Sequence, residues 1–85
     1  MPDETSLVRR AQQNDRNALE ELFRINYPVL LGALVRIISD PRAAEDIAQE
    51  TVLRAIVNLE RYEPRAKFST WLITIALNIR KNKLR

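Results

Sequence analysis

The sequence predicts an all-α protein, a compact bundle of about four helices. The chain of 85 residues contains one glycine and four prolines, and so few turn-forming residues favour a few long helices over a series of strands. Apolar residues recur at the i, i+3, i+4 spacing of amphipathic helices along most of the chain. Hydrophobic residues make up 46% and charged residues 29%, which is typical of a folded globular protein. We therefore expect residues 1–85 to form a single domain.

The first two helices are separated by Asn14-Asp15, which ends one and offers an N-cap to the next. The first covers residues 6–13. Its inward face consists of Leu7, Val8 and Ala11. The apolar stripe of the second consists of Ala18, Leu19, Leu22, Phe23, Leu30, Leu31, Leu34 and Val35. Pro28 lies inside this second helix, so we expect a kink or a short break near Asn26 and Tyr27.

The third helix is expected over about residues 41–59. It follows the turn signal Ser39-Asp40-Pro41, in which proline suits the first helical position. Its inner stripe consists of Ala44, Ile47, Ala48, Thr51, Ala55 and Ile56. A loop over residues 60–67, punctuated by Pro64, follows it.

The fourth helix begins near Ser69 or Thr70, either of which can cap it, and continues to the end of the chain. Its core stripe consists of Phe68, Leu72, Ile75, Ala76 and Ile79. The chain stops on a helical pattern without a C-cap, so we expect it to be a fragment of a longer chain.

The composition excludes several classes of chemistry. The chain has no cysteine and no histidine, which rules out disulfides, thiol or imidazole catalysis, and zinc sites built from these residues. Asp46 and Glu50 lie one helical turn apart and could hold Mg²⁺, but no other catalytic group accompanies them in the sequence. We interpret them as a solvated or partner-facing acidic patch. We therefore expect a protein that is not an enzyme and has no metal or cofactor.

The sequence also gives an expectation about location. The first residues carry acids where a secretory signal needs a basic start, and the most apolar stretch, residues 29–38, is too short to span a bilayer. We expect a cytoplasmic protein without membrane insertion.

Charge is distributed unevenly along the chain. Residues 1–60 hold seven Arg and ten Asp or Glu, a net charge of −3, whereas residues 61–85 hold seven Lys or Arg and one Glu, a net charge of +6. A mildly acidic first part and a strongly basic last part indicate two partners of opposite character, one of them a nucleic acid. The alternative is a basic tail that only keeps the protein soluble.

The fourth helix carries a polar stripe beside its core stripe. This polar stripe consists of Trp71, Thr74, Asn78, Lys81 and Arg85. An aromatic ring can stack on an unpaired base, Asn and Thr can hydrogen-bond to base edges, and cations can neutralise phosphates. Trp71 could instead complete the core. Tyr62, Arg65 and Lys67 in the preceding loop favour the nucleic-acid interpretation, because an aromatic ring, a proline and cations suit the capture of a flipped base.

Two motifs together resemble region 2 of the extracytoplasmic-function (ECF) sigma factors. The run DIAQET at residues 46–51 is followed, after a loop, by KFSTWL at 67–72 and IALN at 75–78. Residues 7–12 and 15–22 also fit the first helices of that family, so the resemblance covers essentially the whole chain. It implies a cytoplasmic, nucleoid-associated transcription factor domain. Such a domain binds core RNA polymerase and melts the promoter −10 element by capturing bases of the single-stranded non-template strand.

The resemblance also implies roles for individual residues. Residues that dock on the coiled coil of the polymerase β′ subunit would be Asp46, Gln49, Glu50 and Leu53. The DNA-binding residues would be Arg54, Asn58, Tyr62, Arg65, Lys67, Ser69, Thr70, Trp71, Asn78, Arg80 and Lys81. Tyr62 and the loop around Pro64 would form one wall of a pocket for a flipped base, with Arg54 and Asn58 below it.

Within the same set, Trp71 and Asn78 would lie where the duplex begins to separate. The phosphate-binding residues would be Lys67, Ser69, Thr70, Arg80 and Lys81. The family's second domain, region 4, is absent from these 85 residues, and an anti-sigma factor is commonly a further partner in the family.

Two other interpretations stay open. One is a helical protein-interaction module whose basic tail is incidental, and the other is a helix-turn-helix protein that reads duplex DNA. The long loop between the third and fourth helices argues against the second, because that motif has a turn of only a few residues.

Overall fold

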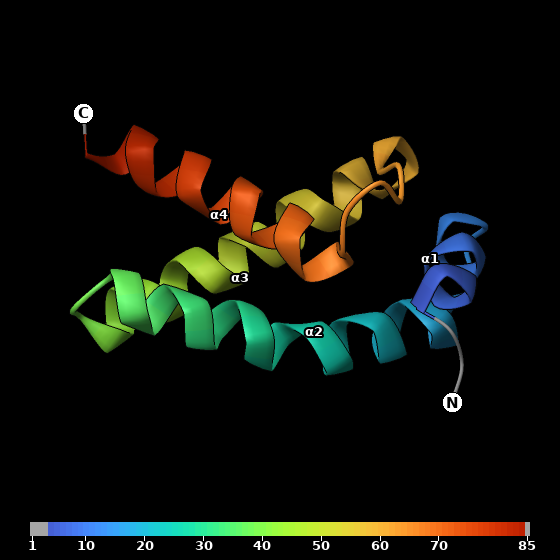
Figure 1. Cartoon of the computed structure of the whole chain (residues 1–85), viewed down its shortest axis with the longest axis horizontal. Helices are drawn as coiled ribbons and strands as arrows, with labels where there is room; N and C mark the ends of the chain where they lie inside the picture. Colours follow the sequence, from blue (N-terminus) through green and yellow to red (C-terminus); the bar gives the residue numbers. More distant parts are fainter. Residues whose placement is uncertain (1–3, 85) are drawn as a thin grey trace.

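Four α-helices and one short 3-10 turn make up the part of the chain that a computed structural model describes, residues 4–84 (Figure 1). The elements are α1 (Glu4–Gln12), α2 (Arg16–Ile37), α3 (Pro41–Asn58), the 3-10 turn η1 (Leu59–Arg61) and α4 (Phe68–Lys83). The all-α fold with four helices, predicted from the sequence, is confirmed. Arg85, which the sequence places on the polar stripe of the last helix, lies outside the described residues.

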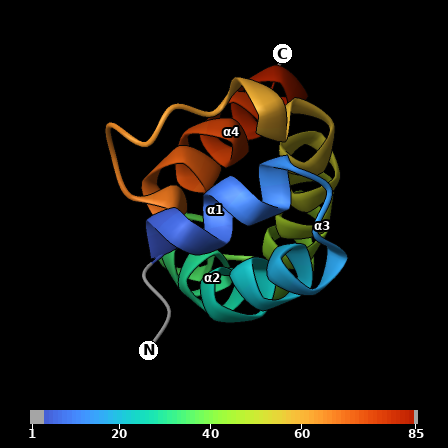
Figure 2. The same cartoon turned by 90° about the vertical axis from the view of Figure 1, so that its right-hand side faces the viewer.

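Helices α2, α3 and α4 pack against one another, and α1 lies across one end of them. In Figure 1, α2 and α3 run in opposite directions, and α4 crosses over them. Figure 2 looks at the end where α2 begins and α3 stops, and it shows α1 beside the segment that joins α3 to α4. We call this segment, residues 59–67, the α3–α4 connection.

The core lies where α2, α3 and α4 meet. Its largest fully buried apolar side chains are those of Leu22, Leu30, Leu34, Phe68, Leu72 and Ile79. Helix α3 contributes small residues that are also fully buried, namely Ala44, Ala48, Thr51 and Ala55. Small side chains let neighbouring helix backbones approach closely. The larger side chains of α2 and α4 therefore pack against the small residues of α3.

Most residues of the predicted apolar stripes are buried or half-buried, but Val35 and Ile56 are 43% and 42% exposed. Each directly follows a fully buried residue, Leu34 or Ala55. Because a helix turns by about 100° per residue, both side chains point away from the core. Their assignment to the core is therefore wrong.

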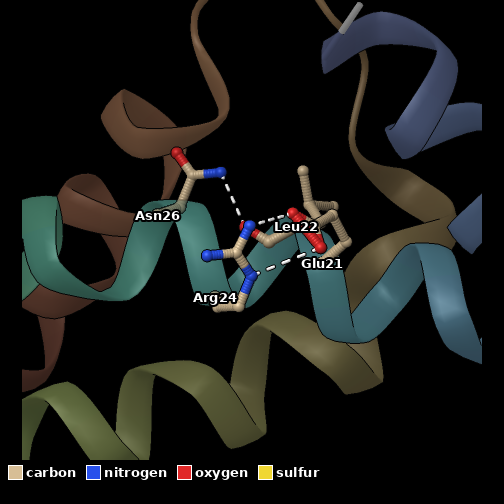
Figure 3. Close-up of polar contacts among 4 residues, drawn as sticks. All are labelled: Glu21, Leu22, Arg24 and Asn26. Carbon is tan, nitrogen blue, oxygen red and sulfur yellow. Dashed lines mark hydrogen bonds and ion pairs between the residues drawn. The ribbon is translucent and has the colours of Figure 1, made fainter. Parts of the chain in front are cut away.

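Helix α2 continues through Pro28, where the sequence predicts a kink or a short break. Pro28 itself is exposed, whereas Asn26, two residues earlier, is only 3% exposed. Asn26 Nδ2 donates to the Leu22 carbonyl over 2.8 Å (Figure 3), which ties the turn before the proline to its own helix. The predicted break is therefore wrong, and Asn26 is a polar core residue that the sequence does not reveal.

Aspartates cap α2 and α3. Asp15 Oδ1 accepts a hydrogen bond from the Ala18 N–H at 3.1 Å, as predicted. That N–H, and then the Arg10 guanidinium at 3.0 Å, hold the pKa of Asp15 below its ordinary value. Asp40 caps α3 in the same way, with Pro41 as the first helical residue.

Helix α4 is capped neither by Ser69 nor by Thr70, which corrects the prediction. It begins at Phe68, and its N-cap residue makes no side-chain cap bond. The Phe68 N–H donates instead to Glu4 Oε1 of α1 over 3.1 Å. Because Phe68 is fully buried, packing in the core fixes the start of the helix ahead of these polar residues.

Candidate nucleic-acid interface

A pocket of about 330 Å³ opens between the end of α3, η1 and the middle of α4, and we call it the α3/α4 pocket. It is lined by Arg54, Asn58, Arg61, Trp71, Ile75 and Asn78. The structure thus brings together four of the predicted DNA-binding residues from two helices. Arg61 and Ile75 were not predicted here. The sequence indicates Arg61 only as one cation of the basic segment, and Ile75 as a core residue.

The α3/α4 pocket is rich in hydrogen-bond donors, and its lining includes no carboxylate. Asn58 Nδ2 donates to the Arg54 carbonyl over 2.9 Å, which leaves Oδ1 as the acceptor that Asn58 can offer a ligand. The Arg54 guanidinium pairs with Glu50 at 2.9 Å, whereas Arg61 makes no side-chain hydrogen bond or ion pair within residues 4–84. Beside the half-buried indole of Trp71, this lining suits a planar group with carbonyl or ring-nitrogen acceptors, such as an unpaired base.

Aromatic rings hold Trp71 in place. Its ring centroid lies 4.9 Å from that of Tyr62 and 5.5 Å from that of Phe68, and the Tyr62 and Phe68 rings meet edge to face at 5.3 Å. Tyr62 is only 6% exposed, and its hydroxyl donates to the Ala66 carbonyl. Burial, and then the Glu4 carboxylate, raise the pKa of Tyr62. Trp71 is therefore the aromatic ring that lines the α3/α4 pocket, and Tyr62 supports it from the core side.

A second pocket, of about 270 Å³, lies between α1 and the α3–α4 connection. It is lined by Glu4, Thr5, Val8, Tyr62, Pro64, Arg65, Ala66 and Lys67. Three predicted DNA-binding residues, Tyr62, Arg65 and Lys67, thus share this pocket. Arg65 and Lys67 are exposed, and Arg65 pairs with Glu63 at 3.1 Å. The contribution of α1 was not predicted, because no local pattern links residues so far apart in the sequence.

The remaining predicted DNA-binding residues are distributed along α4. Ser69 and Thr70 lie in its first turn, half-buried and exposed respectively, and Lys81 is exposed in its last turn. Arg80 lines a different hollow, next to the turn between α2 and α3, together with Lys83. The structure therefore does not bring Arg80 into the α3/α4 pocket.

An open groove of about 620 Å³ lies between α2 and α3, and we call it the α2/α3 groove. It is lined by Phe23, Arg24, Tyr27, Gln49, Val52 and Leu53. Gln49 and Leu53 are predicted polymerase-binding residues, and Leu53 is 66% exposed. Arg24 pairs with Glu21 on its own helix (Figure 3), so the single cation of the lining is neutralised. The groove is thus an accessible surface with an apolar floor.

The two acidic residues of the predicted polymerase-binding face differ in their surroundings. Asp46 is exposed on α3, one turn before Gln49. Glu50 instead pairs with Arg54 at 2.9 Å and with Lys83 of α4 at 3.4 Å. Glu50 therefore links α3 to α4 beside the α3/α4 pocket, and the two carboxylates do not form one uniform patch.

Within residues 4–84, no helix is both long and apolar enough to cross a membrane. In the same range, the acidic side chains form no group of three or more that could hold a metal ion.

Comparisons with known proteins extend these observations. The family model described as sigma-70 region 2 matches residues 22–85. RNA polymerase sigma factor CarQ of Myxococcus xanthus is 37% identical over 78 residues, which cover 92% of this chain and 45% of that protein. RNA polymerase sigma-H factor of Pseudomonas aeruginosa is also 37% identical, over 92% of this chain and 40% of that protein. ECF RNA polymerase sigma factor SigW of Bacillus subtilis is 32% identical, over 92% and 42%. The chain spans less than half the length of these relatives.

Proposed function

Because the chain belongs to the sigma-70 region 2 family, we propose that it is the part of a sigma factor that binds core RNA polymerase and opens promoter DNA at the −10 element. The resemblance to region 2 of the ECF sigma factors, predicted from the sequence, is confirmed by the match to the sigma-70 region 2 model and by relatives named as ECF RNA polymerase sigma factors. In this proposal the chain acts by binding and strand capture and performs no bond chemistry.

The observation that carries the DNA-binding part of the proposal is the composition of the α3/α4 pocket. Extruding a base from the duplex costs a few kcal/mol, and stacking on one aromatic ring returns about 1–3 kcal/mol. Trp71 supplies the ring. Asn58 and Asn78 offer amide groups to the base edge, and the guanidinium of Arg61 can bind a base carbonyl or a neighbouring phosphate. The pocket therefore offers both affinity for any unpaired base and a means to distinguish bases.

Cations on either side of the pocket are suited to the phosphates of the captured strand. Arg65 and Lys67 lie at the second pocket, and Lys81 lies near the end of α4. Ser69 and Thr70 in the first turn of α4 can add hydroxyl contacts. Arg80, which is set apart from the pocket, is a candidate for phosphate contact further along the strand.

The α2/α3 groove is the surface that we propose for core polymerase, with the β′ coiled coil as its partner. Leu53 and Gln49 lie in it, and α2 adds Phe23 and Tyr27, which the sequence did not indicate as polymerase-binding residues. Exposed Asp46 can pair with a basic side chain of the coiled coil. An anti-sigma factor that covers these surfaces is a further proposed partner.

Binding to single strands and to duplex of the same sequence tests the proposal. Fluorescence anisotropy should show tighter binding to single-stranded non-template −10 oligonucleotides, and the affinity should fall as salt rises. Equal or tighter binding to the intact duplex would contradict strand capture and favour reading in the major groove. The α3–α4 connection spans residues 59–67, which is longer than the turn of a helix-turn-helix. We therefore expect tighter binding to the single strand.

A further inference from the structure

Helix α1 precedes the residues that the family model matches, 22–85, yet its side chains contact both ends of the α3–α4 connection. At the first end, Gln12 Nε2 donates to the Leu59 carbonyl over 3.0 Å and to the Tyr62 carbonyl over 2.9 Å. These bonds join residues 47 and 50 positions apart. One amide group therefore fixes η1 and the residue that follows it.

At the second end, Glu4 fixes the start of α4. The Phe68 N–H donates to Glu4 Oε1 over 3.1 Å, and Asn26 Nδ2 lies 3.5 Å from Glu4 Oε2. A carboxylate at this place also interacts favourably with the dipole of α4. Glu4 thus connects the start of α4 to the buried amide of α2.

Helix α1 is itself firmly placed. Leu7 and Val8 are each 3% exposed and Ala11 is 5% exposed, so one face of α1 belongs to the core. Figure 2 shows α1 lying along the connection, with its first turn beside the start of α4 and its last turn towards the end of α3. A helix held in this way can restrain both ends of the connection at once.

The stretch between the two ends has few contacts of its own. Residues 63–67 are all exposed. Within the described chain, the polar contacts of this stretch are a backbone bond from Arg65 to Glu63 at 2.7 Å, the Arg65–Glu63 ion pair at 3.1 Å, the bond from the Tyr62 hydroxyl to Ala66, and the bond from the Trp71 N–H to the Lys67 carbonyl at 3.2 Å. The contacts from α1 therefore act together with the packing of the Tyr62 ring on Phe68 and Trp71 to fix the two ends of this stretch.

We propose that Gln12 and Glu4 are positioning residues for strand capture, and that α1 is a brace that holds the α3–α4 connection in its DNA-binding shape. This inference rests on the proposed function and adds to it a pair of residues that need not touch DNA. When only a fraction of the molecules hold the binding site in its competent shape, the apparent affinity is reduced by that fraction. Removing the contacts from α1 should therefore weaken strand capture, although no DNA-contacting residue has been replaced.

The variant Gln12→Glu tests the brace most sharply. Glutamate has nearly the shape of glutamine, but an ionised carboxylate donates no hydrogen bond, so both carbonyls of the connection lose their donor. Gln13→Glu is the matched control, because it adds the same charge one residue further along, at an exposed position. Any general repulsion between an added charge and DNA is then common to both variants.

Trp71 provides a readout that does not depend on DNA. It is the single tryptophan of the chain, and its ring packs on Tyr62 at 4.9 Å. Acrylamide quenching of its fluorescence in the native protein reports how well the connection is held, while urea unfolding gives the folded fraction of each variant. Relative to Gln13→Glu, Gln12→Glu should show stronger quenching and about 3- to 10-fold weaker binding to single-stranded −10 oligonucleotides. Both variants should bind core polymerase equally.

Equal quenching and equal oligonucleotide affinity for the two variants would overturn the proposal. A lower unfolding free energy of Gln12→Glu with unchanged quenching and affinity would also overturn it, since Gln12 would then only stabilise the fold. If Gln12→Glu does not fold, Glu4→Ala tests the other end of the brace with the same two readouts, and Glu20→Ala, which removes the same charge at an exposed position, is its control. If the parent protein binds no single-stranded DNA, the proposed function fails, and the quenching comparison still decides whether α1 holds the connection.

Discussion

Replacing Tyr62 by phenylalanine and by alanine separates a buried supporting ring from a surface ring that stacks on DNA. The phenylalanine variant keeps the ring against Phe68 and Trp71 and loses one hydrogen bond, from the hydroxyl to the Ala66 carbonyl. A hydrogen bond of this kind contributes a net 0.5–1.5 kcal/mol, roughly. Because Ala66 is exposed, water can satisfy its carbonyl, and we expect a loss of about 0.5–1 kcal/mol. That loss corresponds to a fall in Tm of roughly 2–8 °C for a domain of this size.

The alanine variant removes the whole ring from a site that is 6% exposed. Truncating a buried aromatic residue to alanine costs about 3–5 kcal/mol, a large share of the total stability of a small domain. Thermal and urea unfolding followed by circular dichroism measure both variants, and anisotropy measures oligonucleotide binding under conditions where each is folded. Tyr62→Phe should bind within about twofold of the parent, because it keeps the ring that packs against Trp71. If Tyr62→Ala kept its unfolding free energy and lost oligonucleotide affinity, Tyr62 would be a surface stacking ring and the reasoning would be refuted.

Three further predictions concern other parts of the molecule. Asn58→Ala removes the Oδ1 acceptor of the α3/α4 pocket and should flatten base preference at one −10 position in a four-base oligonucleotide scan; an unchanged preference would contradict its role. Leu53→Asp should weaken pull-down of core polymerase without changing oligonucleotide binding. Val57→Asp, at an 81% exposed site outside the groove, should leave the pull-down of core polymerase unchanged. Equal losses for the two variants would mean that the groove is not the docking surface. The lowered pKa of Asp15 means that its ionised form stabilises the fold above the ordinary carboxyl range, and that this contribution is lost as the pH falls through the lowered pKa. The difference in urea unfolding between the parent and Asp15→Asn should therefore shrink in acid, and a difference independent of pH would contradict this.

The parts of the fold that local patterns encode could be predicted from the sequence. Leu22, Leu30 and Leu34 recur on one helical face and are buried, and Asp15 caps α2 as its position before an apolar stripe indicates. These features depend on residues that are close together in the sequence. The resemblance, not the spacing, implied that Arg54 and Asn58 line one pocket; they do share the α3/α4 pocket, but with Trp71, whereas Tyr62 and Pro64 line the second pocket.

The features that could not be predicted arise from contacts between distant segments. Glu4 caps α4 from 64 residues away, so the first polar residues of α4 were wrongly taken as its caps. Periodicity does not apply to a loop, and it could not show that the ring of Tyr62 is buried against Phe68 and Trp71. Likewise, the spacing of Glu50 on α3 gave no sign that Lys83 of a neighbouring helix would pair with it. In each case the partner is set by how the helices pack.

Photo-cross-linking of the chain to DNA tests most directly whether the α3/α4 pocket captures unpaired bases. Trypsin cleaves after Lys67 and Arg80, so one peptide, residues 68–80, carries both Trp71 and Asn78 of the pocket. Single-stranded non-template −10 oligonucleotides with 5-iodouracil in place of thymine, irradiated in complex with the chain and digested, show by mass spectrometry which peptide a base touches. We predict cross-links in residues 68–80 or 55–61, and far fewer with the same sequence as duplex. Cross-links confined to residues 17–24 of α2, or equally abundant with duplex, would contradict capture of an unpaired base in this pocket.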